Sequence, residues 1–222
     1  MNEVTQKMGM SRKTAHQYIK LFDGDYGQVR DVLIVEATWL GYYEPFTIRS
    51  ISSFIYEMMV KANRQQVAEE YGLMPFEAQV LEPTRTLCEK IMSLVRFSYG
   101  ELPIEDLKKK IRHVYDLHQL LKNTEILNFF QSEYFDEMLL KVAQDDVISF
   151  KNNNKWLIYH PKEALVFENA EKIWEEIKDT YNDDFRFMVF GKQFPDDIEI
   201  LSSLRNIANR IAEIKWDINI EV

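Results

Sequence analysis

The sequence has little of what several protein classes depend on. Cysteine occurs once, at Cys88, so no internal disulfide can form, which suits a reducing compartment. Seven glycines and six prolines are few for the many tight turns of an all-β protein, so we expect helix to dominate. No apolar run approaches the roughly 20 residues that span a bilayer, and the first residues lack the apolar segment of a signal peptide. These absences predict a cytoplasmic protein without a membrane segment.

What the sequence does contain is a core-forming composition and an excess of acid. Of the 222 residues, 46% are hydrophobic, enough for one large domain or two small ones. The net charge of −9 argues against sequence-independent wrapping of nucleic acid over the whole surface. Acidic residues are frequent from Glu133 onward. One hypothesis is therefore a helical interaction protein whose acidic rear half engages a basic partner.

Predicted elements divide the chain near Pro83. Residues 29–39 are apolar on both faces, which predicts a central strand, and residues 76–81 alternate as a second strand. Helices are expected in the front at 11–22, capped by Ser11, and at 51–71, and in the rear at 86–97, 104–122, 132–148, 162–181 and 196–215. The predicted fold is α+β and predominantly helical, with a mixed module at 1–82 and a helical module at 83–222.

One lysine stands in an unusual position on the helix expected at 86–97. Thr86 and Glu89 have the spacing of a capping box. Lys90 lies at the edge of the apolar stripe of that helix, so its ammonium group either extends outward to water or meets an anion. The pattern alone favours extension to water. Cys88 reads as an ordinary core residue, because no nearby feature would activate its thiol.

The next helix carries a cluster of polar residues that periodicity places at the surface. Asp116 points nearly away from the apolar side, and Arg112 lies one turn earlier, which predicts a surface ion pair. His113 and His118 are five residues apart, the wrong spacing for two ligands on one helical face, so we do not expect a zinc site.

The N-terminus supports a different hypothesis. Residues 4–19 have the pattern of a helix-turn-helix, with Gly9 in the turn and Arg12, Lys13 and Thr14 at the start of a recognition helix. This pattern would make the chain a DNA-binding or antitoxin-like module.

Three segments together carry a family resemblance. These are Val32-Leu-Ile-Val-Glu36, Pro83-Thr-Arg-Thr-Leu-Cys-Glu-Lys90 and Arg112-His-Val-Tyr-Asp-Leu117. In this order and spacing they resemble the nucleotidyltransferase AbiEii/AbiGii toxin family. The resemblance implies a partial nucleotidyltransferase-like sheet followed by a helical C-terminal part. It also implies a toxin of a bacterial toxin–antitoxin or phage-defence system that uses a nucleoside triphosphate and Mg²⁺. A cognate antitoxin is the implied partner, and transfer RNA is a possible acceptor.

The resemblance also implies roles for single residues. Glu36, near the end of its strand, would match the third metal-binding acid. Lys90 would contact the nucleotide phosphates, with Arg112 beside it, and Asp116 would lie in the active-site cleft.

The sequence departs from the family pattern in one respect. Such enzymes carry a Gly-Ser loop followed by Asp-x-Asp on a strand. The nearest candidate, Asp23-Gly-Asp25, lies in a turn cluster without the apolar residues of a strand. We therefore expect the chain to correspond to the C-terminal part of such an enzyme. Alone it would be inactive, and it would use Mg²⁺ and nucleotide only if the missing motif were supplied.

Overall fold

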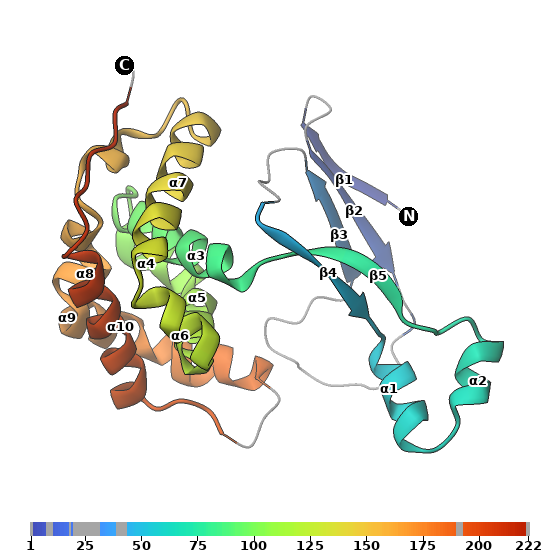
Figure 1. The fold of residues 1–222 in the computed structure, drawn as a ribbon. Coiled ribbons are helices and arrows are strands. Elements are labelled where there is room, and N and C mark those ends of the chain that lie inside the picture. Colours follow the sequence, from blue (N-terminus) through green and yellow to red (C-terminus); the bar gives the residue numbers. More distant parts are fainter. Residues whose placement is uncertain are drawn as a thin grey trace.

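The chain separates into a region of strands with two short helices and a region of packed helices (Figure 1). The computed structural model describes residues 2–7, 11–17, 19, 32–38, 44–189 and 193–220. The strands among these residues are β1 (Asn2–Lys7), β2 (Ser11–Gln17), β3 (Val32–Thr38), β4 (Phe46–Ile51) and β5 (Phe76–Leu81). The helices of the strand region are α1 (Phe54–Lys61) and α2 (Gln65–Glu70).

The helical region follows directly after β5. Its helices are α3 (Pro83–Ser98), α4 (Pro103–Lys109), α5 (Ile111–Lys122), α6 (Thr124–Phe130), α7 (Glu133–Ser149), α8 (Leu165–Glu168), α9 (Ala170–Thr180) and α10 (Asp197–Ile211). Short 3-10 helices lie at Lys155–Ile158, Pro161–Glu163 and Arg186–Met188, and a π-helical turn at Tyr181–Phe185. Helix α3 lies nearest the strands (Figure 1).

The first sheet replaces the expected N-terminal helices. β2 pairs antiparallel with both β1 and β3, and Lys13 lies opposite Glu36 in the register. The predicted helix at 11–22 and the helix-turn-helix are therefore wrong; Gly9 and Asp23-Gly-Asp25 lie outside the described residues. Hydrogen bonding to two neighbouring strands outweighs the weak helical preference of so short a segment. β3 was expected as a strand, but it forms an edge of the described sheet rather than its centre.

The second sheet brings together two strands that are separated by the α1–α2 excursion. β4 and β5 pair antiparallel along their whole length, from Phe46 opposite Leu81 to Ile51 opposite Phe76. The prediction of β5 is confirmed, whereas the single helix expected at 51–71 is wrong. The Ser53 side chain caps α1 by accepting a hydrogen bond from the Tyr56 amide, so the helix begins only there. Asn63, with a φ of 56°, separates α1 from α2.

Helices dominate the rest of the chain, as the sequence predicts, but several are shorter. The helix expected at 86–97 begins earlier, because Pro83 occupies its first turn, where a missing N–H costs nothing. Thr86 therefore lies inside α3, and the capping box predicted for Thr86 and Glu89 is wrong. The helix expected at 104–122 is interrupted at Lys110, whose backbone departs from the helical conformation. The helix expected at 162–181 is broken into the 3-10 helix at Pro161–Glu163, α8 and α9.

The main hydrophobic core belongs to the helical region. The large buried cluster draws its members from Leu87 to Ile214 and includes Trp174, which is 1% exposed. Cys88 is fully buried within it, and burial raises the pKa of its thiol well above the usual value, which confirms an ordinary core residue. By contrast, α1 buries none of its residues, and Phe54 is 86% exposed. The fold is α+β and predominantly helical, as predicted.

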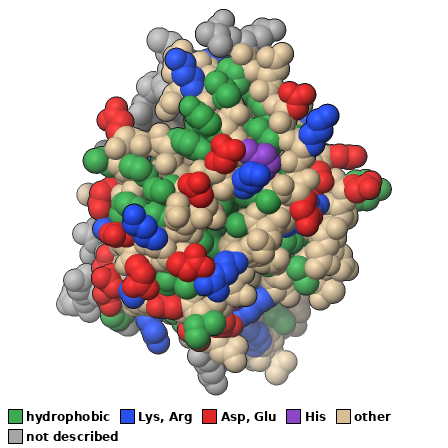
Figure 2. All heavy atoms as spheres, turned by 90° about the vertical axis from the view of Figure 1, so that its left-hand side faces the viewer, with side chains coloured by type: hydrophobic (Ala, Val, Ile, Leu, Met, Phe, Trp, Pro, Cys, Tyr) green, Lys and Arg blue, Asp and Glu red, His purple; other side chains and the backbone are tan. Residues whose placement is uncertain are grey.

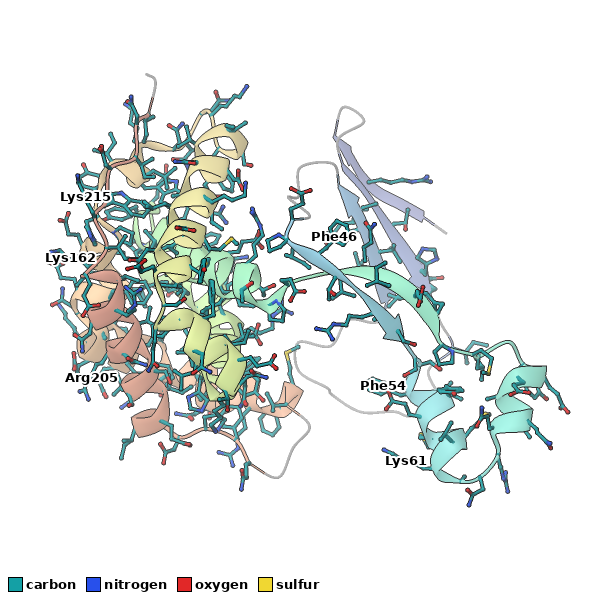
Figure 3. The ribbon with its side chains drawn as sticks, in the orientation of Figure 1. Phe46, Phe54, Lys61, Lys162, Arg205 and Lys215 are labelled. Carbon is teal, nitrogen blue, oxygen red and sulfur yellow. The ribbon has the colours of Figure 1, made fainter. Side chains whose placement is uncertain are left out.

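The outer face of the helical region carries mixed charge. Acidic and basic side chains are interspersed there (Figure 2), and Lys162, Arg205 and Lys215 lie on the side away from the sheets (Figure 3). Arg205 donates a hydrogen bond to Glu171 across this face, at 2.6 Å. Such an arrangement is typical of a solvated surface. In the described part of the chain, no helix is both long enough and apolar enough to span a membrane.

Candidate functional site

Lys90 meets an anion at the contact between α3 and α5. Its Nζ donates a hydrogen bond of 2.7 Å to Oδ2 of Asp116, and Nδ1 of His113 lies 3.3 Å from the same nitrogen. The side chains of Lys90 and Asp116 are 18% and 28% exposed. The expectation that Lys90 extends to water is therefore wrong, and so is the expected pairing of Asp116 with Arg112.

The geometry of the two helices explains this contact. His113 and Asp116 are three residues apart, so they project from the same face of α5. That face is turned toward α3, although it lies beside rather than within the apolar stripe of α5. A hydrogen bond between two charged groups contributes on the order of 1.5–3 kcal/mol when it is shielded from water. The pair therefore fixes Lys90 against α5 instead of leaving it as a mobile surface charge.

His113 is neutral in this environment. Burial lowers its pKa from 6.5 to about 4, and the positive charges of Lys90 and Lys110 act in the same direction. Asp116 acts in the opposite direction, but more weakly than either of these causes. A lysine ammonium group has three donors and no acceptor. The short distance between Lys90 and His113 therefore requires that Nδ1 accepts the hydrogen bond.

A pocket of about 680 Å³ opens beside Lys90 and Asp116, between β4 and the helical region. This volume is in the usual range for a small-molecule site. Its lining comes from β4, α3, α5 and the start of α6: Arg49, Glu82, Pro83, Thr84, Thr86, Lys90, Asp116, Gln119, Leu120, Asn123, Glu125 and Ile126. The strand region and the helical region therefore both contribute residues to the lining of this pocket.

Several features of this pocket favour a negatively charged ligand. Arg49 and Lys90 place two cationic groups in its lining. Thr84, in the first turn of α3, also lines it and has a backbone N–H, whereas Pro83 has none and the Glu82 N–H donates to the Pro45 carbonyl. The amide groups of a helix N-terminus carry partial positive charge. Three acids in the lining, Glu82, Asp116 and Glu125, oppose this attraction, and Asp116 is paired with Lys90, so the pocket is mixed in charge rather than basic.

The other predicted site residues lie elsewhere. Glu36 is 62% exposed on β3 and forms an ion pair with Lys13 on β2. It is not among the residues that line the pocket. Arg112 is exposed on α5 and is likewise absent from the lining. On β2, Arg12 is exposed and Thr14 is 8% exposed, with its hydroxyl 3.0 Å from Nε2 of His16. Of the residues predicted for the nucleotidyltransferase site, Lys90 and Asp116 are the two that line the pocket together.

The described residues do not form a site suited to Mg²⁺. No three carboxylate, imidazole or thiol groups in the described ranges lie close enough together to hold a metal ion. Asp116 is already bound to Lys90, and Glu36 to Lys13. Metal-dependent phosphoryl transfer needs a set of oxygen ligands that converge on the cation. The described residues alone therefore do not support a metal-dependent step.

Sequence reasoning missed two residues of the site. Arg49 lies on β4, in a segment without a predicted strand, so its position across the pocket could not be anticipated. The spacing of His113 and His118 excludes a zinc site on one helical face, and the sequence predicts no other role for His113. Its spacing of three residues from Asp116 was the available signal, since it places both side chains on one helical face.

Comparison with known proteins yields one match. A protein-family model described as "Nucleotidyl transferase AbiEii toxin, Type IV TA system" matches residues 2–197. This range extends well beyond the three segments that carry the resemblance in sequence. Neither the curated proteins nor the solved structures include a significant match.

Proposed function

Because the chain belongs to the nucleotidyl transferase AbiEii toxin family of type IV toxin–antitoxin systems, we propose that its pocket binds the polyphosphate group of a nucleoside triphosphate. The observation that carries this proposal is the position of Lys90. Its ammonium group is shielded from bulk water, lines the pocket and is held by Asp116. A cation fixed in this way is suited to a phosphate oxygen.

The surroundings of Lys90 support the same ligand. Arg49 offers a second cation from β4, and Thr84, in the first turn of α3, offers one backbone N–H. The volume of about 680 Å³ leaves room for the nucleoside as well as the phosphates.

Nucleotide binding and nucleotidyl transfer are separate steps. The sequence has no Gly-Ser pair ahead of Asp23-Gly-Asp25, and the described residues offer no converging metal ligands. We therefore propose that this chain binds nucleotide but does not transfer a nucleotidyl group unless the acidic motif is supplied. Mg²⁺ would enter with that motif, and a cognate antitoxin is the partner that the toxin–antitoxin family implies.

Substitution of Lys90 tests the binding step. Replacing Lys90 with Ala should weaken binding of ATP and of tripolyphosphate about 10- to 100-fold, because one charge-assisted hydrogen bond is lost. Isothermal titration calorimetry measures both affinities directly. Lys109→Ala is the matched control, because Lys109 is 69% exposed, pairs with Asp106 and lies outside the pocket. Equal affinity in the wild type and the Lys90 variant would contradict the proposal.

A further inference from the structure

The hydrogen bonds of Lys90 leave one donor for the pocket. An ammonium group has three N–H donors in a tetrahedral arrangement. In the described part of the chain, two of them are directed at Asp116 Oδ2, at 2.7 Å, and His113 Nδ1, at 3.3 Å. Because two directions are fixed, the third is fixed as well. Lys90 lines the pocket, so this third donor is available to a ligand there.

His113 can accept the hydrogen bond from Lys90 only in one protonation state and tautomer. Its Nδ1 must carry a lone pair, so the ring is neutral and its proton is on Nε2. The cations around it, Lys90, Lys110 and Arg112, disfavour a protonated ring, and Asp116 is the nearby group that opposes them. A second positive charge at Nδ1 would repel Lys90 rather than hold it.

We infer that His113 is a positioning residue for Lys90: its Nδ1 accepts a hydrogen bond from the ammonium group and, with Asp116, directs the remaining N–H into the pocket. This inference rests on the proposed function, in which that N–H binds a phosphate oxygen. With Asp116 as its only partner, the long side chain of Lys90 could rotate about a single contact. Ligand binding would then have to order the side chain, which weakens affinity.

Two substitutions separate this role from mere packing. Asn at position 113 can place its Oδ1 near the position of Nδ1 and accept the same hydrogen bond, whereas Leu fills space without an acceptor. We expect His113→Leu to weaken tripolyphosphate binding about three- to tenfold, because Lys90 loses one of the two hydrogen bonds that orient it. His113→Asn should remain within about twofold of the wild type. His16→Leu is the control, because His16 lies on β2 outside the pocket.

The outcomes distinguish this inference from the proposed function. If the wild type does not bind tripolyphosphate, or if Lys90→Ala binds it equally well, the proposed function fails. If Lys90 matters but His113→Leu binds like the wild type, only the positioning role is overturned. Equal weakening by His113→Leu and His113→Asn overturns it too, because a suitable acceptor would then have failed to restore binding.

A spectroscopic measurement on the unaltered chain tests the inference without relying on variants. Two-bond ¹H–¹⁵N correlation spectra at pH 7 distinguish the two neutral forms of histidine. The His113 ring should show a protonated Nε2 and an unprotonated Nδ1. A proton on Nδ1 would exclude the acceptor role.

Discussion

The chemistry of the pocket depends on a histidine that resists protonation. Burial is the main cause that lowers the pKa of His113 to about 4, and the charges of Lys90 and Lys110 add to it. In the unfolded chain the same ring would titrate near 6.5. Between these two values the unfolded chain binds a proton that the folded chain does not. The stability associated with His113 is therefore present above pH 6.5 and is lost as the pH falls toward 4.

A comparison across pH tests this coupling. Between pH 7 and pH 4.5, the free energy of unfolding should fall more in the wild type than in His113→Asn, by on the order of 2 kcal/mol. Urea titrations at both pH values measure this difference. Burial of Asp146 raises its pKa to about 6 and acts in the opposite direction, but it contributes to both proteins and cancels. Identical losses in the two proteins would contradict the neutral, buried state of His113.

For single residues, the sequence predicted that Lys90 and Asp116 belong to one site, but it did not predict the hydrogen bond between them. Helical periodicity alone placed Asp116 at the surface beside Arg112, because it describes one helix at a time. The family resemblance assigned both Lys90 and Asp116 to one site, and the structure joins them. The two residues are 26 positions apart and lie on separate helices, and the relative orientation of those helices depends on packing that no local pattern encodes.

Between elements, a buried ion pair connects α3 to α7. Arg85 is 1% exposed and donates hydrogen bonds of 2.8 Å to Asp145 on α7 and to Glu89 on its own helix. The side chain of Asp145 is 13% exposed. Each charge is expensive to bury alone, so the pair specifies how the two helices align even where its net contribution to stability is small.

Removal of Arg85 alone should lower the free energy of unfolding far more than removal of both Arg85 and Asp145. We expect Arg85→Leu to lower the free energy of unfolding by about 3–5 kcal/mol, because Asp145 is left as a buried charge without its guanidinium partner. The double variant Arg85→Leu/Asp145→Leu should recover a large part of this loss. Chemical denaturation measures both. Lys122→Met is the control, since Lys122 is 50% exposed and its ion pair with Glu199 is at the surface. Additive losses in the double variant would show that the two residues do not depend on each other.

The elements themselves were predictable to different degrees. β5 and α7 follow from clear alternation and helical periodicity, and their observed bounds are close to the expected ones. The segments expected as long helices at 51–71 and 104–122 are divided in the structure. A serine cap, a left-handed asparagine and a departure at Lys110 divide them, and these are local events that a periodic pattern passes over. β2 was missed because its stability comes from its neighbours β1 and β3 rather than from its own residues.

In the whole molecule, the two regions contribute unequally to the core. The buried cluster lies entirely between Leu87 and Ile214, whereas α1 contributes no buried residue. The hydrophobic free energy of folding therefore comes mainly from the helical region. Helix α3 starts at Pro83, and the domain boundary expected there stays a prediction.

This distribution predicts that residues 83–222 fold without the strands. Expressed alone, this segment should show a helical circular dichroism spectrum and a cooperative thermal transition, because it retains every member of the buried cluster. It should bind tripolyphosphate more weakly than the full chain, since Arg49 is absent. A gradual, non-cooperative loss of helix on heating would show instead that the strands are needed for the fold.

The α1–α2 excursion also makes the molecule accessible to labelling. β4 and β5 are paired from end to end, so the excursion leaves and rejoins the sheet at neighbouring positions. Asn63, at its turn, is exposed and lies outside the pocket lining. An epitope or a fluorophore inserted at this turn would be anchored by the β4–β5 ladder without altering the walls that hold Arg49 and Lys90. The same chain could then report its location in a living cell while its binding site remains intact.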